Sequence, residues 1–368
     1  MKWTWKIGRL AGIDVYVHAT FFILIAWIGL SYWEVGQSVL AVVTGVGFIL
    51  ALFGCVVLHE LGHALMARRY GIRTKHITLL PIGGVALLER MPDDPKQEVK
   101  VALAGPAVNL VIALALWLWL SLANATVPID QLDLTAGPFL ERLMVINAFL
   151  AVFNLLPAFP MDGGRVLRAL LAMRMERSQA TQIAASVGQG LALMLGLLGL
   201  LYNPFLIFIA LFVWIGAAAE AGVERIKSVL SGVAVGRAMM TEYQPLSPDD
   251  PLTRAVELTL AGSQKDFPVQ ADGTIIGVLS QVDQLKGLQE KGQEARVGDA
   301  MQSESQSSDI GESLEQVLTR LQDSACRLLS VTDAGLPVGI VNLDNVIELV
   351  NIQTALLSES SPGSSKKR

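Results

Sequence analysis

Uncharged apolar runs about twenty residues long dominate the first part of the sequence. One of them, Val39 to Leu58, contains no charged side chain and a single hydroxyl, that of Thr44. Such a run is long enough to cross a bilayer as a helix. Six runs are predicted to be transmembrane helices, at roughly 17–35, 38–67, 101–124, 139–157, 183–201 and 204–221. The sequence therefore predicts a multi-pass membrane protein, with the fourth span interrupted by Asn147 and Asn154.

Composition agrees with this prediction and excludes some partners. Hydrophobic residues make up 52% of the 368 residues and charged residues 17%, which is more apolar than an ordinary globular protein. The excess lies before about residue 221, so the rest of the chain is predicted to be a soluble domain. A net charge of -5 gives no indication of nucleic-acid binding. The expected environment of the first part is the lipid bilayer.

Basic residues gather on one side of the predicted spans. The linkers on that side are 1–9, 68–100, 162–180 and the region after 221. The alternate linkers are 34–37, 125–142 and 202–204, and Arg142 is their sole basic residue. Cytosolic loops carry the excess of Lys and Arg in membrane proteins. The pattern predicts a cell-membrane protein with both termini and the soluble domain in the cytosol.

Two histidines and a glutamate end the second apolar run, in 58-LHELGHALMARRY-70. Residues four apart lie on one face of a helix, so His59 and His63 can bind one metal ion. Glu60 lies beside them, where it can take a proton from a water molecule. The HExxH pattern is typical of zinc with a carboxylate general base. Helical histidines satisfied by neighbouring carbonyls are the alternative, which the cost of intramembrane polar groups disfavours.

A third ligand is expected from 154-NLLPAFPMDGGR-165, where Pro157 and Pro160 exclude a regular helix. Asp162 is the only acid in that segment and lies at the same end of the spans as His63. Two histidines and one carboxylate leave the fourth position of a tetrahedral zinc site open, as in catalytic sites. A plain turn aspartate is the alternative interpretation. The helical rise places the two histidines about 7–13 Å inside the basic end of the span.

These residues resemble the site-2 proteases, a family of intramembrane zinc metalloproteases, in the prokaryotic subgroup with paired CBS domains at the C-terminus. The resemblance is carried by 59-HELGH-63, 105-GPAVN-109 and the segment ending in MDGGR. It implies one Zn²⁺ per chain, held by His59, His63 and Asp162, with Glu60 as the catalytic glutamate. It also implies that Asn109 contacts substrate or the oxyanion; the alternative is a polar residue that bridges helices.

Two further segments match the family loosely. Residues 77–90 resemble its membrane-associated hairpin, which is proposed to present substrate by edge pairing; the alternative is an ordinary interfacial loop. His18 fits a family pattern at the start of the first span, but we interpret it as a helix-entry histidine rather than a ligand.

The soluble part contains an internal repeat, with copies at 235–293 and 296–352 that each open with V-G-x-A-M. Each copy is expected to contain an amphipathic helix, two strands joined by a turn, and a closing helix. The repeat resembles a tandem CBS pair, which implies an adenine nucleotide in the cleft, with Ser280 and Asp283 holding the ribose. A structural module, or one that forms a homodimer, is the alternative.

The predicted fold class is thus a polytopic α-helical membrane protein of about six transmembrane helices with a C-terminal α/β cytosolic tandem CBS domain. The expected domains are 1–227, the metalloprotease; 228–352, the CBS pair; and 353–368, a disordered tail. The predicted function is zinc endopeptidase cleavage of a transmembrane segment in a single-span membrane protein, as in regulated intramembrane proteolysis. The alternative is a CBS-regulated transporter or channel, although transporters usually show repeated spans and midplane sites.

Overall fold

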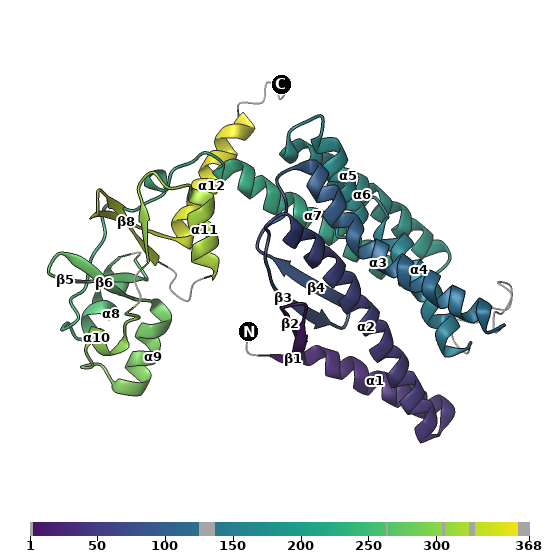
Figure 1. Ribbon diagram of the computed structural model, residues 1–368. Helices are drawn as coiled ribbons and strands as arrows, with labels where there is room; N and C mark the ends of the chain where they lie inside the picture. The colour runs from purple at the N-terminus through teal and green to yellow at the C-terminus, as the bar shows by residue number, and fades with distance from the viewer. Residues whose placement is uncertain (1–2, 125–136, 263, 304–305, 324–327, 360–368) are drawn as a thin grey trace. The chain divides into compact units, whose positions relative to one another are not determined.

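The chain separates into two compact units, Met1–Gly222 and Val223–Arg368 (Figure 1). The computed structural model describes residues 3–124, 137–262, 264–303, 306–323 and 328–359. Most of the predicted linker 125–142 and the end of the predicted tail lie outside these residues.

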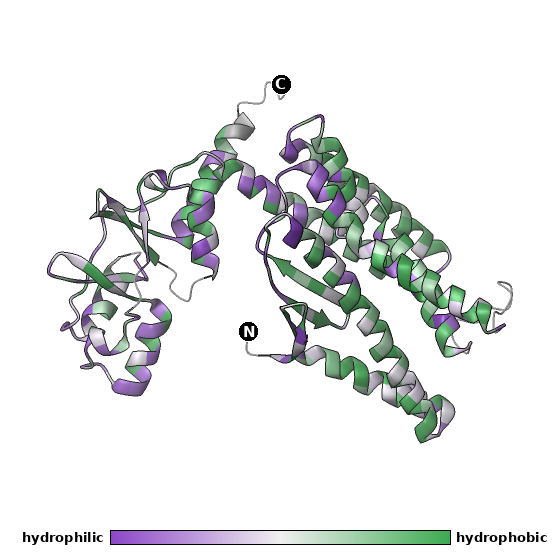
Figure 2. Cartoon of the chain, viewed as in Figure 1, coloured by the Kyte–Doolittle hydropathy of each residue, from purple (hydrophilic) through white to green (hydrophobic). Residues whose placement is uncertain are grey.

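Long apolar helices build the first unit (Figure 2). Within the described residues, five are long and apolar enough to cross a membrane: α1 (Ala19–Gly36), α2 (Val39–Arg69), α3 (Pro95–Leu122), α6 (Arg177–Leu201) and α7 (Phe205–Leu230). Their outer faces carry large exposed hydrophobic side chains, such as Ile23 and Trp27 of α1. A helix that faces lipid has an apolar outer surface, because the hydrocarbon core contains no water to hydrogen-bond polar groups. The first unit is therefore a multi-pass membrane domain.

The fourth predicted span is helical but short. Helix α4 (Phe139–Asn154) has 16 residues and ends before Pro157, whose ring cannot continue a helix. An irregular segment follows, and α5 (Asp162–Ala172) begins at the proposed third ligand. Helix α5 packs against α3 and α6. The chain thus returns Asp162 to the bundle through the non-helical segment that the two prolines predict.

A four-stranded sheet lies beside α2. Its order is β1 (Thr4–Leu10), β2 (Ile13–His18), β3 (Thr74–Leu80) and β4 (Gly83–Leu88). The central strands β2 and β3 are parallel, and the outer pairs are antiparallel. Val17 and Leu79 pack with Val57 in one buried cluster, which holds the sheet against the part of α2 that carries the histidines. The segment predicted as a hairpin is β3 and β4, and β4 is an edge strand.

The second unit contains the predicted repeat. Copy one contains a short 3₁₀ turn, Val235–Arg237, then α8 (Leu252–Ala261), β5 (Phe267–Ala271), β6 (Thr274–Leu279) and α9 (Gln281–Lys291). Copy two contains α10 (Val297–Ala300), β7 (Ser307–Asp309), α11 (Leu314–Asp323), β8 (Leu328–Asp333), β9 (Leu336–Asn342) and α12 (Leu343–Glu359). In both copies a helix precedes an antiparallel strand pair and a second helix follows it. Each copy thus has the helix, strand-pair, helix arrangement that the repeat predicts.

The C-terminal tail differs from the expectation. Helix α12 continues through Glu359, so residues 353–359 are helical where the sequence predicts disorder. Composition alone misses this because the preceding amphipathic helix extends into the polar segment. Residues 360–368 lie outside the described part of the chain.

Candidate metal centre

The ring of His63 is oriented by a backbone carbonyl. Its Nδ1 lies 2.7 Å from the carbonyl oxygen of Val101 in α3. A carbonyl oxygen can only accept, so Nδ1 carries the proton and Nε2 has a free lone pair in the neutral ring. Metal-binding histidines commonly have this arrangement, in which a partner of one nitrogen presents the other to the ion. His63 is therefore held in a ligand orientation.

Three potential ligand atoms meet at one point. The Nε2 atoms of His59 and His63 are 3.2 Å apart, and Asp162 Oδ2 lies 3.2 Å and 3.1 Å from them. All three side chains are buried. Tetrahedral ligands about 2.0–2.1 Å from zinc are separated from one another by roughly 3.3 Å. The observed triangle has nearly these dimensions, so the residues fit a zinc ion.

The chemistry of the three atoms supports the same interpretation. With Nδ1 of His63 protonated, its Nε2 lone pair faces the Asp162 carboxylate, which is also an acceptor. Buried acceptors this close to one another are unfavourable unless a cation or a shared proton lies between them. Two nitrogens and one carboxylate oxygen match the donor set of catalytic zinc sites with an open fourth position.

Gly105 of α3 makes room for the histidine rings. A Cβ at this position would collide with Nε2 of His63 and would lie 2.6 Å from Nε2 of His59. Any side chain would therefore occupy the space in which the ligand atoms meet. The absence of a side chain lets α3 approach the ligand face of α2.

Asp162 reaches the centre as the first residue of α5, preceded by Met161 at the helix N-cap. The Nε2 atoms of both histidines lie beside one oxygen of its carboxylate, Oδ2. Nη1 of Arg165 lies 3.9 Å from the other carboxylate oxygen. The structure thus brings Asp162 to both histidines, at a sequence separation of about one hundred residues.

Glu60 lies beside the ligands but points to the sheet. Its Oε2 accepts a hydrogen bond of 3.0 Å from the backbone N–H of Ala86 in the edge strand β4. Glu60 as a whole is half-buried. This bond orients the carboxylate through one oxygen, Oε2, so the other oxygen, Oε1, can still accept a proton from water.

Asn109 lies one helical turn beyond Gly105, on the same face of α3. It is 1% exposed, and its Oδ1 has no hydrogen-bond partner among the described residues. A buried amide oxygen without a partner is unfavourable. Asn109 therefore lies on the face of α3 that carries Gly105, and no hydrogen bond from its Oδ1 to another described residue bridges the helices.

His18 does not belong to the centre. It is the N-cap of α1, where its ring accepts from the backbone N–H of Thr20 and contacts the Thr20 hydroxyl at 2.8 Å. The interpretation of His18 as a satisfied helix-entry histidine agrees with this geometry.

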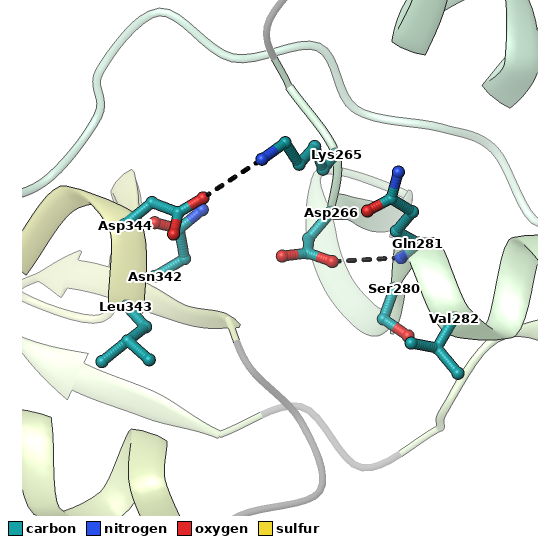
Figure 3. Close-up of a pocket in the computed structure, with 8 residues that line it drawn as sticks. All are labelled: Lys265, Asp266, Ser280, Gln281, Val282, Asn342, Leu343 and Asp344. Carbon is teal, nitrogen blue, oxygen red and sulfur yellow. Dashed lines mark hydrogen bonds and ion pairs between the residues drawn. The ribbon is translucent and has the colours of Figure 1, made fainter.

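The second unit has a small pocket of about 180 Å³ between its two copies (Figure 3). Copy one contributes Lys265, Asp266, Ser280, Gln281 and Val282, and copy two contributes Asn342, Leu343 and Asp344. Lys265 Nζ lies 3.7 Å from Asp344 across the opening. Ser280 lines the pocket, whereas Asp283 does not.

The carboxylate of Asp283 is already bonded within the unit. It accepts from the Ser280 hydroxyl at 2.6 Å and from Nε2 of Gln302 at 2.8 Å. The backbone N–H of Asp283 also donates to Ser280 Oγ. At the corresponding positions of copy two, the side-chain oxygens of Asn342 and Asn345 each accept from the other's backbone N–H. Both pairs thus stabilise the start of the closing helix of their copy.

Several residues that shape the metal centre were not predicted from sequence. Val101 acts through its carbonyl and Ala86 through its N–H, so neither side chain signals the contact. Gly105 stands in the quoted GPAVN motif, but its role depends on which helix packs against α2. The HExxH pattern therefore indicates candidate ligands but not the groups that orient them.

A membrane helix that carries HExxH, completed by an aspartate from a second helix, defines the class of membrane-embedded metalloproteases. The comparisons with known proteins agree. The model of peptidase family M50 matches residues 47–132 and 120–197. The zinc metalloprotease MJ0392 of Methanocaldococcus jannaschii is 34% identical over 281 residues, which is 76% of this chain and 78% of that protein. The chain therefore belongs to peptidase family M50, the site-2 protease family, and is a zinc metalloprotease.

Two solved structures align with separate parts of the chain. The site-2 protease from Methanocaldococcus jannaschii is 37% identical, covers 60% of this chain and 95% of its own, and has a TM-score of 0.45. CBSX2 in complex with AMP is 26% identical, covers 35% of this chain and 99% of its own, and has a TM-score of 0.29. Family membership confirms the predicted enzyme class and argues against the transporter alternative.

Proposed function

We propose that this protein is an intramembrane endopeptidase that cleaves the transmembrane segment of a single-span membrane protein, as in regulated intramembrane proteolysis. The observation that supports this most directly is the position of the His59–His63–Asp162 triangle, whose two histidines lie in the membrane-spanning helix α2. A soluble substrate would not need a metal centre in such a helix. A substrate helix must unwind locally there, because its peptide carbonyls are otherwise hydrogen-bonded.

His59, His63 and Asp162 would hold the zinc ion, which lowers the pKa of water and polarises a carbonyl group when it is bound. Glu60 would take the proton from the attacking water and deliver it to the leaving amine. Its Oε2 would keep the hydrogen bond from the N–H of Ala86, and its other oxygen, Oε1, would take the proton. The side-chain amide of Asn109 would donate to the oxyanion of the tetrahedral intermediate. The buried surroundings of these groups would strengthen each of these interactions.

The side of the membrane follows from charge. Arg68 and Arg69 end α2 just beyond His63, and the other basic linkers lie on the same predicted side. We therefore infer that the centre opens toward the cytosol, which supplies the water for hydrolysis. Both termini and the CBS pair would then be cytosolic, and one product would be released there.

The CBS pair would regulate the protease or join two copies as a homodimer. The pocket between the repeats, lined by Ser280 and Asn342, supports binding of an adenine nucleotide. Against tight binding, Asp283 is engaged by Gln302, and the pocket contains two acidic side chains, Asp266 and Asp344. The fold would bind a nucleotide with Ser280 and Asp283 at the ribose after Gln302 moves aside.

The test is cleavage of a single-span reporter by the full-length protein in detergent or liposomes. Glu60→Gln should retain zinc and lose cleavage by about 10²–10⁴-fold, the usual contribution of a general base. Glu89→Gln makes the same substitution at an exposed glutamate just beyond β4, and this variant should cleave like the unmodified protein. Cleavage of the reporter by Glu60→Gln at the normal rate would overturn the proposal, and so would purified protein that binds no zinc.

A further inference from the structure

Four charged side chains meet near the start of α3. Glu98 is fully buried, and Arg168 of α5 is 2% exposed. Arg168 donates to Glu98 Oε1 from Nε at 2.8 Å and from Nη2 at 2.5 Å, and to Glu220 of α7 from Nη1 at 2.6 Å. Nη1 of Arg177, the first residue of α6, lies 3.1 Å from Glu98 Oε2. One guanidinium thus connects α3, α5 and α7, and the cluster also reaches α6.

Stability alone is a poor explanation for this cluster. Removing charges from water is costly, and a buried ion pair is often no more stabilising than well-packed hydrophobic side chains of similar volume. The rigid fork of an arginine does, however, fix the relative position of the groups that it binds. The relevant property of Arg168 is therefore the geometry that it imposes on the groups that it binds.

Arg168 is connected to the metal ligands in two ways, through Glu98 and through its own helix. Glu98 lies one helical turn before Val101, whose carbonyl holds His63. On the other side, Arg168 belongs to the helix that begins with Asp162. Its guanidinium also lies 5.3 Å from the ring centre of Phe159, a fully buried residue of the irregular segment just before that helix. Arg168 therefore links the part of α3 that orients His63 to the helix that carries Asp162.

We propose that Arg168 is a positioning residue of the metal centre, which sets the separation between Asp162 and His63 by joining Glu98 to α5 and its preceding segment. Glu220 connects α7 to the same guanidinium group. Helix α7 ends at Leu230, which is buried in the core of the second unit. A change in α7 that withdraws Glu220 would therefore alter the arginine that positions Asp162. This inference rests on the proposed assignment of His59, His63 and Asp162 as the metal ligands.

The test measures metal binding rather than proteolysis. Full-length protein is loaded with Co²⁺, whose absorption spectrum reports ligand geometry, and Zn²⁺ affinity is measured by competition with a chelator. Arg168→Lys keeps the charge but loses the fork, and should weaken zinc binding about 10–100-fold, as changes beyond the direct ligands do, and alter the cobalt spectrum. Glu220→Gln, which leaves the Glu98 contact in place, should have a smaller effect in the same direction.

Arg174→Lys is the matched control, because Arg174 follows the same helix and is exposed; it should bind metal like the unmodified protein. If Arg168→Lys does not fold, Glu220→Gln carries the test. Unchanged spectra and zinc affinity in folded variants with lowered melting temperatures would overturn the inference, because they indicate a purely structural role. His59→Ala separates the two proposals. Normal zinc affinity in His59→Ala contradicts the ligand assignment, whereas lost binding there with normal binding in Arg168→Lys and Glu220→Gln contradicts only the positioning role.

Discussion

The carboxylate of Glu60 accepts a hydrogen bond of 3.0 Å from the backbone N–H of Ala86. Ala86 lies in β4, the edge strand of the sheet, so its N–H can face the helix rather than a further strand. The proposed general base is thereby oriented by a strand that is distant in sequence from the HExxH motif.

Replacing Ala86 by proline removes this N–H without changing a charge, and proline is tolerated in edge strands. Hydrogen bonds to charged groups contribute about 1.5–3 kcal/mol. We therefore expect Ala86→Pro to lower kcat by about tenfold or more and to leave zinc content unchanged. The measurement is reporter cleavage with metal analysis, and Ala86→Gly, which keeps the N–H, is the control. Equal losses in both variants would show that the hydrogen bond is not the cause.

A methyl group at Gly105 would enter the space where the ligand atoms of His59 and His63 meet. Gly105→Ala is therefore expected to abolish zinc binding or force the two helices apart. Metal analysis of the purified variant measures the first outcome directly. The matched control is Gly47→Ala in α2, where an added Cβ meets no atom within 4 Å. Full zinc content in Gly105→Ala would contradict the close packing of α3 on the ligands.

Asp162→Asn removes the negative charge and keeps the shape of the side chain. Because a neutral amide oxygen is a poorer zinc ligand than a carboxylate, we expect a large loss of zinc affinity and of cleavage. The appropriate control is Asp93→Asn, an exposed aspartate paired with Arg90 at the surface. Zinc affinity measured by chelator competition should be normal for Asp93→Asn. Normal affinity for Asp162→Asn would remove Asp162 from the ligand set.

Gln302 and a ribose would compete for the carboxylate of Asp283. If that carboxylate holds the ribose, Gln302→Met should raise the affinity for AMP by about tenfold, because a hydrogen bond to a charged group no longer has to be broken. Gln293→Met, a change at an exposed glutamine, should have no effect. Isothermal titration of the full-length protein with AMP measures both. Unchanged or weaker AMP binding in Gln302→Met would contradict the role assigned to Asp283.

Local patterns were sufficient for much of this fold. The apolar runs that become α1, α2, α3, α6 and α7 predict spans because length and hydropathy are properties of a single segment. Pro157 and Pro160 likewise predict the break before α5, since the missing N–H acts locally. The extent of α12 was not predictable in this way, because a polar composition does not by itself end a helix.

For the metal centre, the sequence alone determined the residues that can do the chemistry. The spacing of His59 and His63 follows from the helical period, and Asp162 was identified by chemical type in a segment that cannot be helical. Only the tertiary structure decided how these groups are held, through Val101, Gly105 and Arg168. Their effects come from a backbone carbonyl, a missing side chain and ion pairs across about seventy residues. Contacts of this kind depend on which helices pack together, and no local pattern encodes that choice.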